Sequence, residues 1–182
     1  MKPESPSRLL DLVVKFAEII KPDTYLELGI LGAETIKKVA PNCKRAIGVD
    51  IKKQFTDPAN FEFHQMTTDD FFLNVTNGQI NLNNVDKLDM VFIDANHSYA
   101  QSLKDFNNVF PYVSENGLIF MHDTFPTCQA HTNSNCTGDT YKAAWEISHP
   151  FKDLGHEMVT IPCFPGLSII RKRWRQVIWG NK

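Results

Sequence analysis

Four carboxylates follow apolar stretches of this sequence, and imidazoles accompany the last two. The residues are Glu27, Asp50, Asp94 with His97, and Asp123 with His122. Carboxylates can bind a cationic group, accept hydrogen bonds from sugar hydroxyls or hold a divalent cation, and an imidazole can act as a general base. Any one of these acids could simply cap a following helix, but apolar patterning does not require acids at so many strand ends. The pattern therefore indicates a ligand site.

The elements that would position these residues alternate between apolar strands and helical segments. Strands are expected at 24–28, 45–50, 61–65, 90–94 and 118–121, and a first helix from Ser5-Pro6 to about Lys21-Pro22. Such alternation predicts an α/β fold, a doubly wound Rossmann-like and mostly parallel sheet of seven strands with helices on both faces. Segments 157–161 and 166–171 predict an antiparallel C-terminal hairpin.

Several helix and loop boundaries also follow from the sequence. Thr67-Thr68-Asp69-Asp70 is expected to start one helix, and Ser98 with Gln101 forms a capping-box pattern for the next. Glu115-Asn116-Gly117 predicts a turn. Segment 124–139 has no periodicity and predicts a long surface loop, followed by a helix over 141–148.

The composition limits the classes of protein that the chain can represent. With 182 residues, 42% of them hydrophobic, we expect one domain over 1–182, with an N-terminal helix at 1–22, a cofactor-binding core at 24–171 and a basic and aromatic tail at 172–182. The net charge of -2 argues against nucleic acid, and no apolar run is long enough for a membrane span. Neither an export signal nor a disulfide pattern is seen, so the expected location is cytoplasmic.

The first glycine turn, Glu27-Leu28-Gly29-Ile30-Leu31-Gly32, lacks the spacing that binds a dinucleotide pyrophosphate. Glu27 would repel a diphosphate but suits a cation, such as the amino group of a methionyl moiety. Asp50 ends the next strand, where it could accept hydrogen bonds from ribose hydroxyls.

Two later motifs give a resemblance to a known family. Phe92-Ile93-Asp94-Ala95-Asn96-His97-Ser98-Tyr99 contains Asp-x-x-His-Ser-Tyr, and Met121-His122-Asp123-Thr124 contains His-Asp-Thr. With these motifs the chain resembles class I S-adenosylmethionine-dependent methyltransferases, in particular a compact subgroup that carries both. Segments 65–72 and 138–143 also resemble blocks of these proteins, and the resemblance runs from about Tyr25 to Arg171.

The resemblance implies S-adenosylmethionine as the methyl donor, with the Thr68-Asp69 turn beside its adenine. The donor-binding residues expected on this basis are Glu27, Gly29, Gly32, Asp50, Thr68, Asp69 and Asp94. The chain departs from the family where further glycines are usual, because it has Leu31 and Ala33 with Gly32 between them. Thr67 stands where many relatives carry an acid.

Methyl transfer from a sulfonium to an oxygen requires an aligned and ionisable acceptor hydroxyl. Asp94, His122 and Asp123, together with His97, could hold Mg²⁺ or another divalent cation, as carboxylates at comparable strand ends do in related metal-dependent O-methyltransferases. His97, with Asp94, could instead act as a catalytic base without metal, or these groups could be purely structural. A zinc site at Cys128, His131 and Cys136 is a weaker alternative, because the spacing fits no standard finger.

The leading hypothesis is therefore O-methylation of a small-molecule acceptor such as a sugar or a secondary metabolite. A nucleotide-cofactor oxidoreductase and a catalytically silent cofactor-binding domain remain alternatives. The acceptor pocket is expected from the N-terminal helix, the 124–139 loop or a partner subunit, and a homodimer is a further expectation.

Overall fold

The computed structural model describes residues 7–82, 87–149 and 155–173. The helices are α1 (Ser7–Ile20), α2 (Glu34–Val39), α3 (Thr68–Thr76), α4 (Tyr99–Val109) and α5 (Thr140–Ile147), with short 3-10 turns η1 (Ala40–Asn42), η2 (Phe110–Tyr112) and η3 (Gln129–Thr132). The strands are β1 (Thr24–Leu28), β2 (Arg45–Asp50), β3 (Phe61–Gln65), β4 (Leu88–Ile93), β5 (Val113–His122), β6 (His156–Ile161) and β7 (Leu167–Lys172). The expected helix start at Ser5-Pro6 and the tail from 174 onward lie outside the described residues.

The seven strands form one sheet in the order β3-β2-β1-β4-β5-β7-β6. The first five strands in this order pair in parallel, while β7 runs antiparallel to both β5 and β6. The α/β fold class, the mostly parallel sheet and the antiparallel C-terminal hairpin are thus confirmed. Strand order reverses between β1 and β4, and ligands bind at such a point in open sheets.

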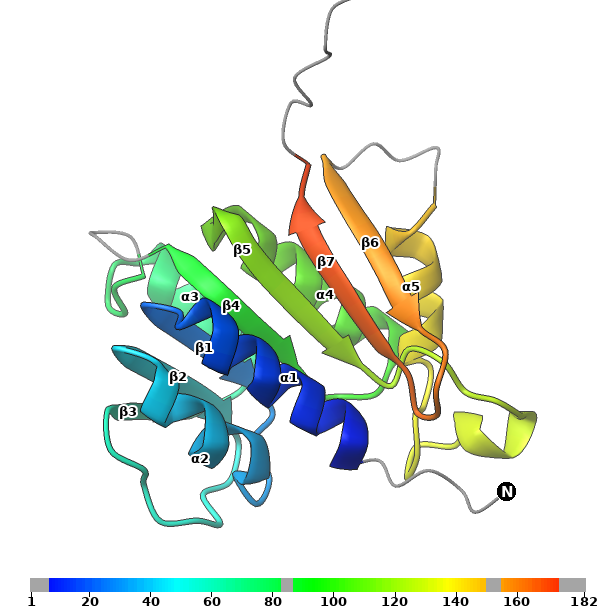
Figure 1. Cartoon of the computed structure of the whole chain (residues 1–182), viewed down its shortest axis with the longest axis horizontal. Helices are drawn as coiled ribbons and strands as arrows, with labels where there is room; N and C mark the ends of the chain where they lie inside the picture. The colour runs from blue at the N-terminus through cyan, green and yellow to red at the C-terminus, as the bar shows by residue number, and fades with distance from the viewer. Residues whose placement is uncertain (1–6, 83–86, 150–154, 174–182) are drawn as a thin grey trace, which may run out of the picture.

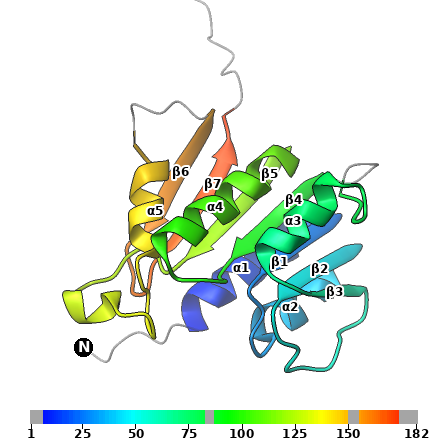
Figure 2. The same ribbon diagram turned by 180° about the vertical axis from the view of Figure 1, so that it is seen from behind.

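Helices cover both faces of the sheet. Figure 1 shows α1 and α2 in front of the strands, and Figure 2 shows α3, α4 and α5 on the opposite face. The carboxyl ends of β4 and β5 point to the side where the segment after β5 lies (Figure 1). Among the described residues, no helix combines the length and apolar character that crossing a membrane requires.

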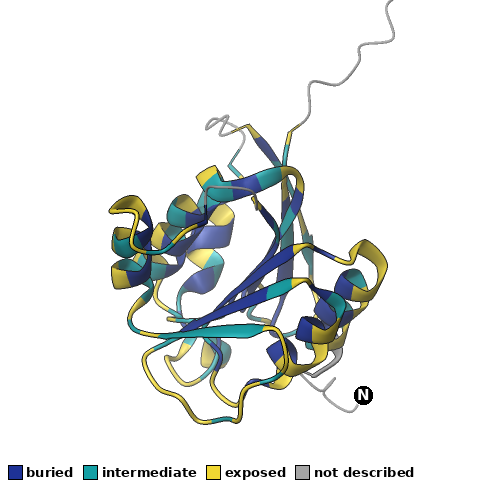
Figure 3. Ribbon diagram, turned by 90° about the vertical axis from the view of Figure 1, so that its left-hand side faces the viewer, coloured by how far each residue is buried: buried dark blue, intermediate teal, exposed yellow. Residues whose placement is uncertain are grey.

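Each face of the sheet has its own apolar core because successive strand residues point to opposite sides. On β1, Leu26 packs with the cluster under α3 and α4, whereas Tyr25 packs with the cluster under α1 and α2. Both residues are fully buried. Figure 3 shows the buried strands lying between the two helical layers.

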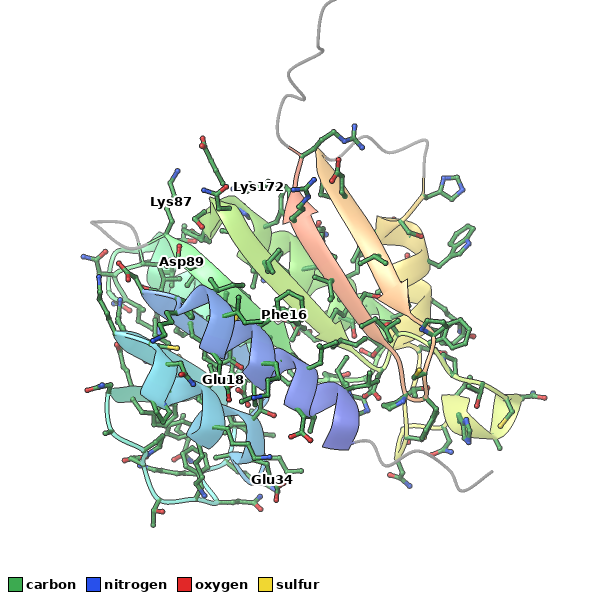
Figure 4. All side chains as sticks on the ribbon, in the orientation of Figure 1. Phe16, Glu18, Glu34, Lys87, Asp89 and Lys172 are labelled. Atoms are coloured by element: carbon green, nitrogen blue, oxygen red, sulfur yellow. The ribbon has the colours of Figure 1, made fainter. Side chains whose placement is uncertain are left out.

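The amphipathic helix α1 covers the middle of one face. Phe16 projects from α1 toward the sheet (Figure 4), where its ring centroid lies 5.2 Å from that of Phe120 on β5. At the amino ends of β1 and β4, Asp89 accepts hydrogen bonds from the backbone N–H groups of Asp23 and Thr24. These contacts fix the start of β1 against β4.

One local prediction was wrong. Glu115 to Gly117 is not a turn before the fifth strand but lies within β5, where the register against β4 shifts between Leu88 and Met90. A Cβ on Gly117 would lie 2.7 Å from the carbonyl oxygen of Leu88, so a glycine lets the irregular strand stay close to its neighbour. A glycine in a β-bulge and a glycine in a turn look alike in a sequence.

Only half of the expected capping box forms. The Ser98 side chain accepts a hydrogen bond from the Gln101 backbone, as predicted, but Asn96 Oδ1 takes the Ser98 N–H. The Gln101 side chain instead points to Thr68 and Asp69. It therefore joins α4 to the start of α3.

Candidate functional site

Two cavities lie at the carboxyl ends of the parallel strands, and both are lined by Gly29. The first has a volume of about 280 Å³ and is lined by residues that include Asp50, Met66, Thr68, Asp69 and Gln101. The second has a volume of about 470 Å³ and is lined by residues that include Glu27, Asp94, His97, His122 and Asp123. The carboxylates at the four strand ends therefore gather around two adjoining spaces.

Gly29 separates the cavities where β1 approaches the end of β4. Its φ is +83°, and a Cβ there would lie 2.2 Å from the carbonyl oxygen of Asp94 and 2.5 Å from the Cα of Ala95. Only glycine combines this conformation with so close a backbone approach.

The rest of the glycine turn keeps its backbone path without glycines. Leu31 (φ 45°) and Ala33 (φ 61°) both adopt left-handed conformations. These are the positions at which the resembling family usually has glycine. Gly32 has no such conformation, and a Cβ there would meet nothing closer than 4.0 Å. Gly32 lines the second cavity, but its backbone does not require glycine.

Asp50 holds the glycine turn at the end of β2. Its Oδ2 accepts hydrogen bonds from the backbone N–H groups of Ile30 at 2.8 Å and Leu31 at 2.9 Å. Its Oδ1 accepts one from Lys52 at 3.0 Å. Since a carboxylate oxygen can accept two hydrogen bonds, Oδ1 retains the capacity for a ligand hydroxyl in the first cavity.

The far wall of the first cavity is the start of α3. The Thr67 side chain caps this helix by accepting a hydrogen bond from the Asp70 N–H. Asp69 is held by Lys104 Nζ at 2.6 Å and by Gln101 Nε2 at 3.1 Å. Lys104 and Gln101 lower the pKa of Asp69, so its carboxylate is ionised beside the cavity.

Glu27 is almost fully buried, with 2% of its surface exposed, at the wall of the second cavity. Its Oε2 accepts a hydrogen bond from the Tyr25 hydroxyl at 2.6 Å. Burial raises the pKa of Glu27 to about 8, against the opposing effect of this hydrogen bond. A cation placed beside Glu27 would favour its ionised form.

Asp94, His97 and Asp123 meet at the second cavity. His97 Nε2 lies 3.1 Å from Asp123 Oδ2 and 3.6 Å from Asp94 Oδ1. Asp123 follows β5 in a left-handed conformation (φ 60°), which is unusual for a residue other than glycine and frequent at functional sites. Because β4 and β5 are neighbours, the two carboxylates lie side by side.

His122 lies behind this group and is 8% exposed. Its Nδ1 is 3.2 Å from Asp94 Oδ1 and 3.5 Å from Asp123 Oδ1, and its ring packs edge-on against Phe92. Its Nε2 is buried and has no hydrogen-bond partner among the described residues. His122 thus supports the carboxylates from the core side.

The charges of these groups stabilise one another. Hydrogen bonding to Asp94 raises the pKa of His97 to about 9, with Asp123 adding to the effect and burial opposing it. Burial would lower the pKa of His122, but Asp94 and Asp123 outweigh it and raise that pKa to about 10. Burial would raise the pKa of Asp94, but both histidines outweigh it and hold it below its ordinary range.

Asp94, His97 and Asp123 also fit a divalent cation. One ligand atom from each of them lies within 4.8 Å of the others, and they are the only group of this kind among the described residues. His97 Nδ1 lies 2.5 Å from the carbonyl oxygen of Cys136, so this nitrogen donates its proton there and Nε2 faces the carboxylates. Histidine ligands of metals are commonly held in this way.

The structure thus brings the sequence-predicted residues together in two sets. Asp50, Thr68 and Asp69 line the first cavity; Glu27, Gly32, Asp94, His97, His122 and Asp123 line the second; and Gly29 lines both. Geometry puts His97 rather than His122 with the two carboxylates as a potential cation ligand. Cys128, His131 and Cys136 form no metal-binding group in the described part of the chain, and His131 instead hydrogen bonds to Thr127.

Two contributions were missed at the sequence level. Gln101 lines the first cavity, and its position three residues after Ser98 indicated only a cap. Cys136 contributes its backbone carbonyl, for which no side-chain pattern exists.

Comparison with known proteins identifies the family of the chain. Residues 30–124, more than half of the chain, match the family model described as a methyltransferase domain. No curated protein sequence matches this chain significantly.

Solved structures share the fold. The O-methyltransferase from Bacillus cereus, in complex with SAH, is similar with a TM-score of 0.67 and 13% identity over 93% of this chain and 82% of that one. TomG from Streptomyces achromogenes, an O-methyltransferase of tomaymycin synthesis in complex with SAM, has a TM-score of 0.69 and 14% identity, over 93% of this chain and 82% of that one. The methyltransferase MycE, solved with Mg, SAH and mycinamycin VI, has a TM-score of 0.64 and 17% identity, over 94% of this chain and 51% of that one. At these identities, the likeness establishes the fold.

Proposed function

Because the chain belongs to the methyltransferase-domain family and has the class I fold of S-adenosylmethionine-dependent methyltransferases, we propose that it transfers the methyl group of S-adenosylmethionine to a hydroxyl of a small molecule. One observation carries the proposal. Two cavities adjoin at Gly29, one beside Asp50 and the other beside the Asp94, His97 and Asp123 cluster. A donor could thus span both and present its methyl group to an acceptor.

The adenosyl group of the donor would occupy the first cavity. Asp50 Oδ1 would accept a hydrogen bond from a ribose hydroxyl, and the ionised Asp69 with Thr68 would face the adenine. The methionyl group would enter the second cavity, where its ammonium would pair with Glu27. The strand-end acids and Gly29 support this placement, as do the S-adenosyl ligands of the Bacillus cereus and TomG structures.

The acceptor hydroxyl would lie beside His97 and Asp123 in the second cavity. That cavity also has apolar walls from Leu10 on α1 and Phe164 in the β6–β7 turn, which would contact the body of a small molecule. MycE binds such a molecule, mycinamycin VI, and this likeness supports a small acceptor without identifying it.

We include a divalent cation in the proposal. Asp94, Asp123 and the Nε2 of His97 would hold it, since carboxylates suit Mg²⁺ and an imidazole extends the choice to metals such as Mn²⁺. When bound, the cation would lower the pKa of the acceptor hydroxyl. Because Asp94 and Asp123 raise the pKa of His97 to about 9, binding of the cation by Nε2 would displace a proton from the ring.

Chelation is expected to reduce methyl transfer at least about 100-fold. The assay would supply S-adenosylmethionine with a labelled methyl group and screen small polyols and phenols as acceptors, with and without chelator and with Mg²⁺ or Mn²⁺ added back. His97→Gln should lower transfer by about 100-fold or more in the presence of metal. His64→Gln, on β3 beside Glu62 and away from both cavities, is the matched control and should retain activity.

Activity that survives thorough chelation would contradict the metal part of the proposal and leave His97 as a base. Donor binding without transfer to any acceptor would instead favour a silent binding domain. The oxidoreductase alternative is not favoured, because Glu27 lies beside the glycine turn where a diphosphate would bind. The single-domain organisation, homodimer and cytoplasmic location stay predictions.

A further inference from the structure

Segment 128–139, between β5 and α5, contacts His97 through both its ring and its backbone. The carbonyl oxygen of Cys136 lies 2.5 Å from His97 Nδ1. The backbone N–H of Asp139 donates to the carbonyl oxygen of His97 at 2.7 Å. The same short stretch of chain therefore holds the residue at two points.

Gly138, between these two contacts, touches His97 directly. A Cβ on Gly138 would lie 2.2 Å from the carbonyl oxygen of His97 and 2.7 Å from its Cβ, and φ is +54°. No other residue type fits here unless His97 or the segment moves. Gly138 begins segment 138–143, which at the sequence level is identified only by its resemblance to a block of the methyltransferase family.

The segment is closed by its own hydrogen bonds, so it can hold a fixed position. Thr137 is fully buried, and both its N–H and its hydroxyl donate to the carbonyl oxygen of His131, at 3.0 Å and 2.8 Å. The carbonyl oxygen of Asn133 accepts from the N–H groups of Cys136 and Gly138, each at 3.0 Å. The His131 ring packs on Phe164, with centroids 4.1 Å apart, which joins the segment to the β6–β7 turn.

We infer that segment 128–139 is a positioning element for His97 and that Gly138 and Thr137 are its positioning residues. The Cys136 carbonyl holds a proton on Nδ1, which turns Nε2 toward Asp123 and Asp94. The importance of His97 rests on the proposed function, whereas the orientation of its ring rests on these contacts alone. A loop that only covered the acceptor would not need hydrogen bonds to both the ring and the backbone of His97.

An NMR experiment on the full ¹⁵N-labelled chain tests the orientation. A proton on Nδ1 that is donated to a carbonyl exchanges slowly with water, so an imidazole N–H signal is expected for the unmodified chain and should vanish in His97→Gln. Gly138→Ala should abolish this signal. Gly78→Ala is the matched control, since Gly78 also has a left-handed φ of +73° but no atom within 4 Å of its added Cβ, and it should keep the signal.

Thr137 provides an independent variant if Gly138→Ala fails to fold. Thr137→Val removes the hydroxyl bonded to His131 and should speed exchange of the imidazole proton about tenfold or more, while Thr137→Ser should restore slow exchange. Calorimetric titration of Mn²⁺ gives a second readout, in which Gly138→Ala should weaken binding by about 10- to 100-fold and Gly78→Ala should not.

The inference is overturned if the unmodified chain lacks the imidazole signal, if Gly138→Ala or Thr137→Val leaves it unchanged, or if Mn²⁺ binds Gly138→Ala as tightly as the unmodified chain. Failure of the unmodified chain to bind S-adenosylmethionine would instead contradict the proposed function. In that case the NMR comparison still decides whether the segment positions His97.

Discussion

Replacing Gly29 by alanine is expected to cost about 4 kcal/mol of folding stability and to abolish donor binding. The added Cβ would lie 2.2 Å from the carbonyl oxygen of Asp94, and the residue would have to adopt a φ of +83°. Because the nearest atoms, which belong to Asp94 and Ala95, are all backbone atoms, relief requires β1 and β4 to move apart at the point where the two cavities meet. Chemical denaturation followed by calorimetric titration of S-adenosylhomocysteine would measure both effects.

Gly32→Ala is the control from the same turn. Its Cβ would meet nothing closer than 4.0 Å, so a change of no more than about 0.5 kcal/mol is expected. Equal destabilisation by the two variants would contradict the view that Gly29 alone is required by the backbone. Loss of donor binding in Gly32→Ala without loss of stability would show that Gly32 contacts the donor, as the sequence predicted.

Glu27→Gln is expected to stabilise the fold while weakening donor binding about 10- to 100-fold. Burial raises the pKa of Glu27 from its ordinary value of 4.5 to about 8. The folded state therefore keeps a proton that the unfolded state has already lost, and stability falls as pH rises from about 4.5 to about 8. A glutamine at this position can still accept the hydrogen bond from the Tyr25 hydroxyl, but it carries no charge that burial would penalise.

The stability difference between the two proteins should therefore depend on pH. At pH 5 Glu27 is protonated in the fold and the two should be similar, whereas at pH 9 the variant should be more stable by about 3 kcal/mol. Denaturation of both proteins at the two pH values checks this. A difference that does not change with pH would mean that Glu27 titrates normally in the fold.

The main features of the fold could be predicted because the apolar stretches of the sequence coincide with the strands that the structure buries. The five parallel strands, the helices between them and the final hairpin follow from continuous apolar runs that burial on two faces requires. The irregular start of β5 could not be predicted, since Glu115 to Gly117 has the composition of a turn and pairing with β4 is made on either side of it, at Val113 and Leu118.

The candidate site could be predicted as far as strand ends determine it. Asp50 ends β2, and Asp94 and Asp123 directly follow β4 and β5. These strands belong to one parallel set, so the topology alone brings the three residues to one edge. The division of roles between His97 and His122 could not be predicted, because it depends on the carbonyl of Cys136, 39 residues away along the chain from His97. The sequence around Gln101 predicts only a local cap. Its side chain can bind Thr68 and Asp69 only once folding has brought α3 beside α4.

The most direct test of the account is calorimetric titration of S-adenosylmethionine and S-adenosylhomocysteine, with NAD as the control ligand. Asp50→Ala removes the carboxylate expected to bind the ribose, Asp50→Asn keeps an oxygen for the Ile30 and Leu31 amides, and Asp57→Ala removes an exposed acid paired with Lys53. We predict micromolar binding of both sulfur ligands, unchanged in Asp57→Ala, weakened in Asp50→Asn, lost in Asp50→Ala and absent for NAD. No binding of either sulfur ligand to the unmodified chain, or equal binding to Asp50→Ala, would contradict the proposed donor site.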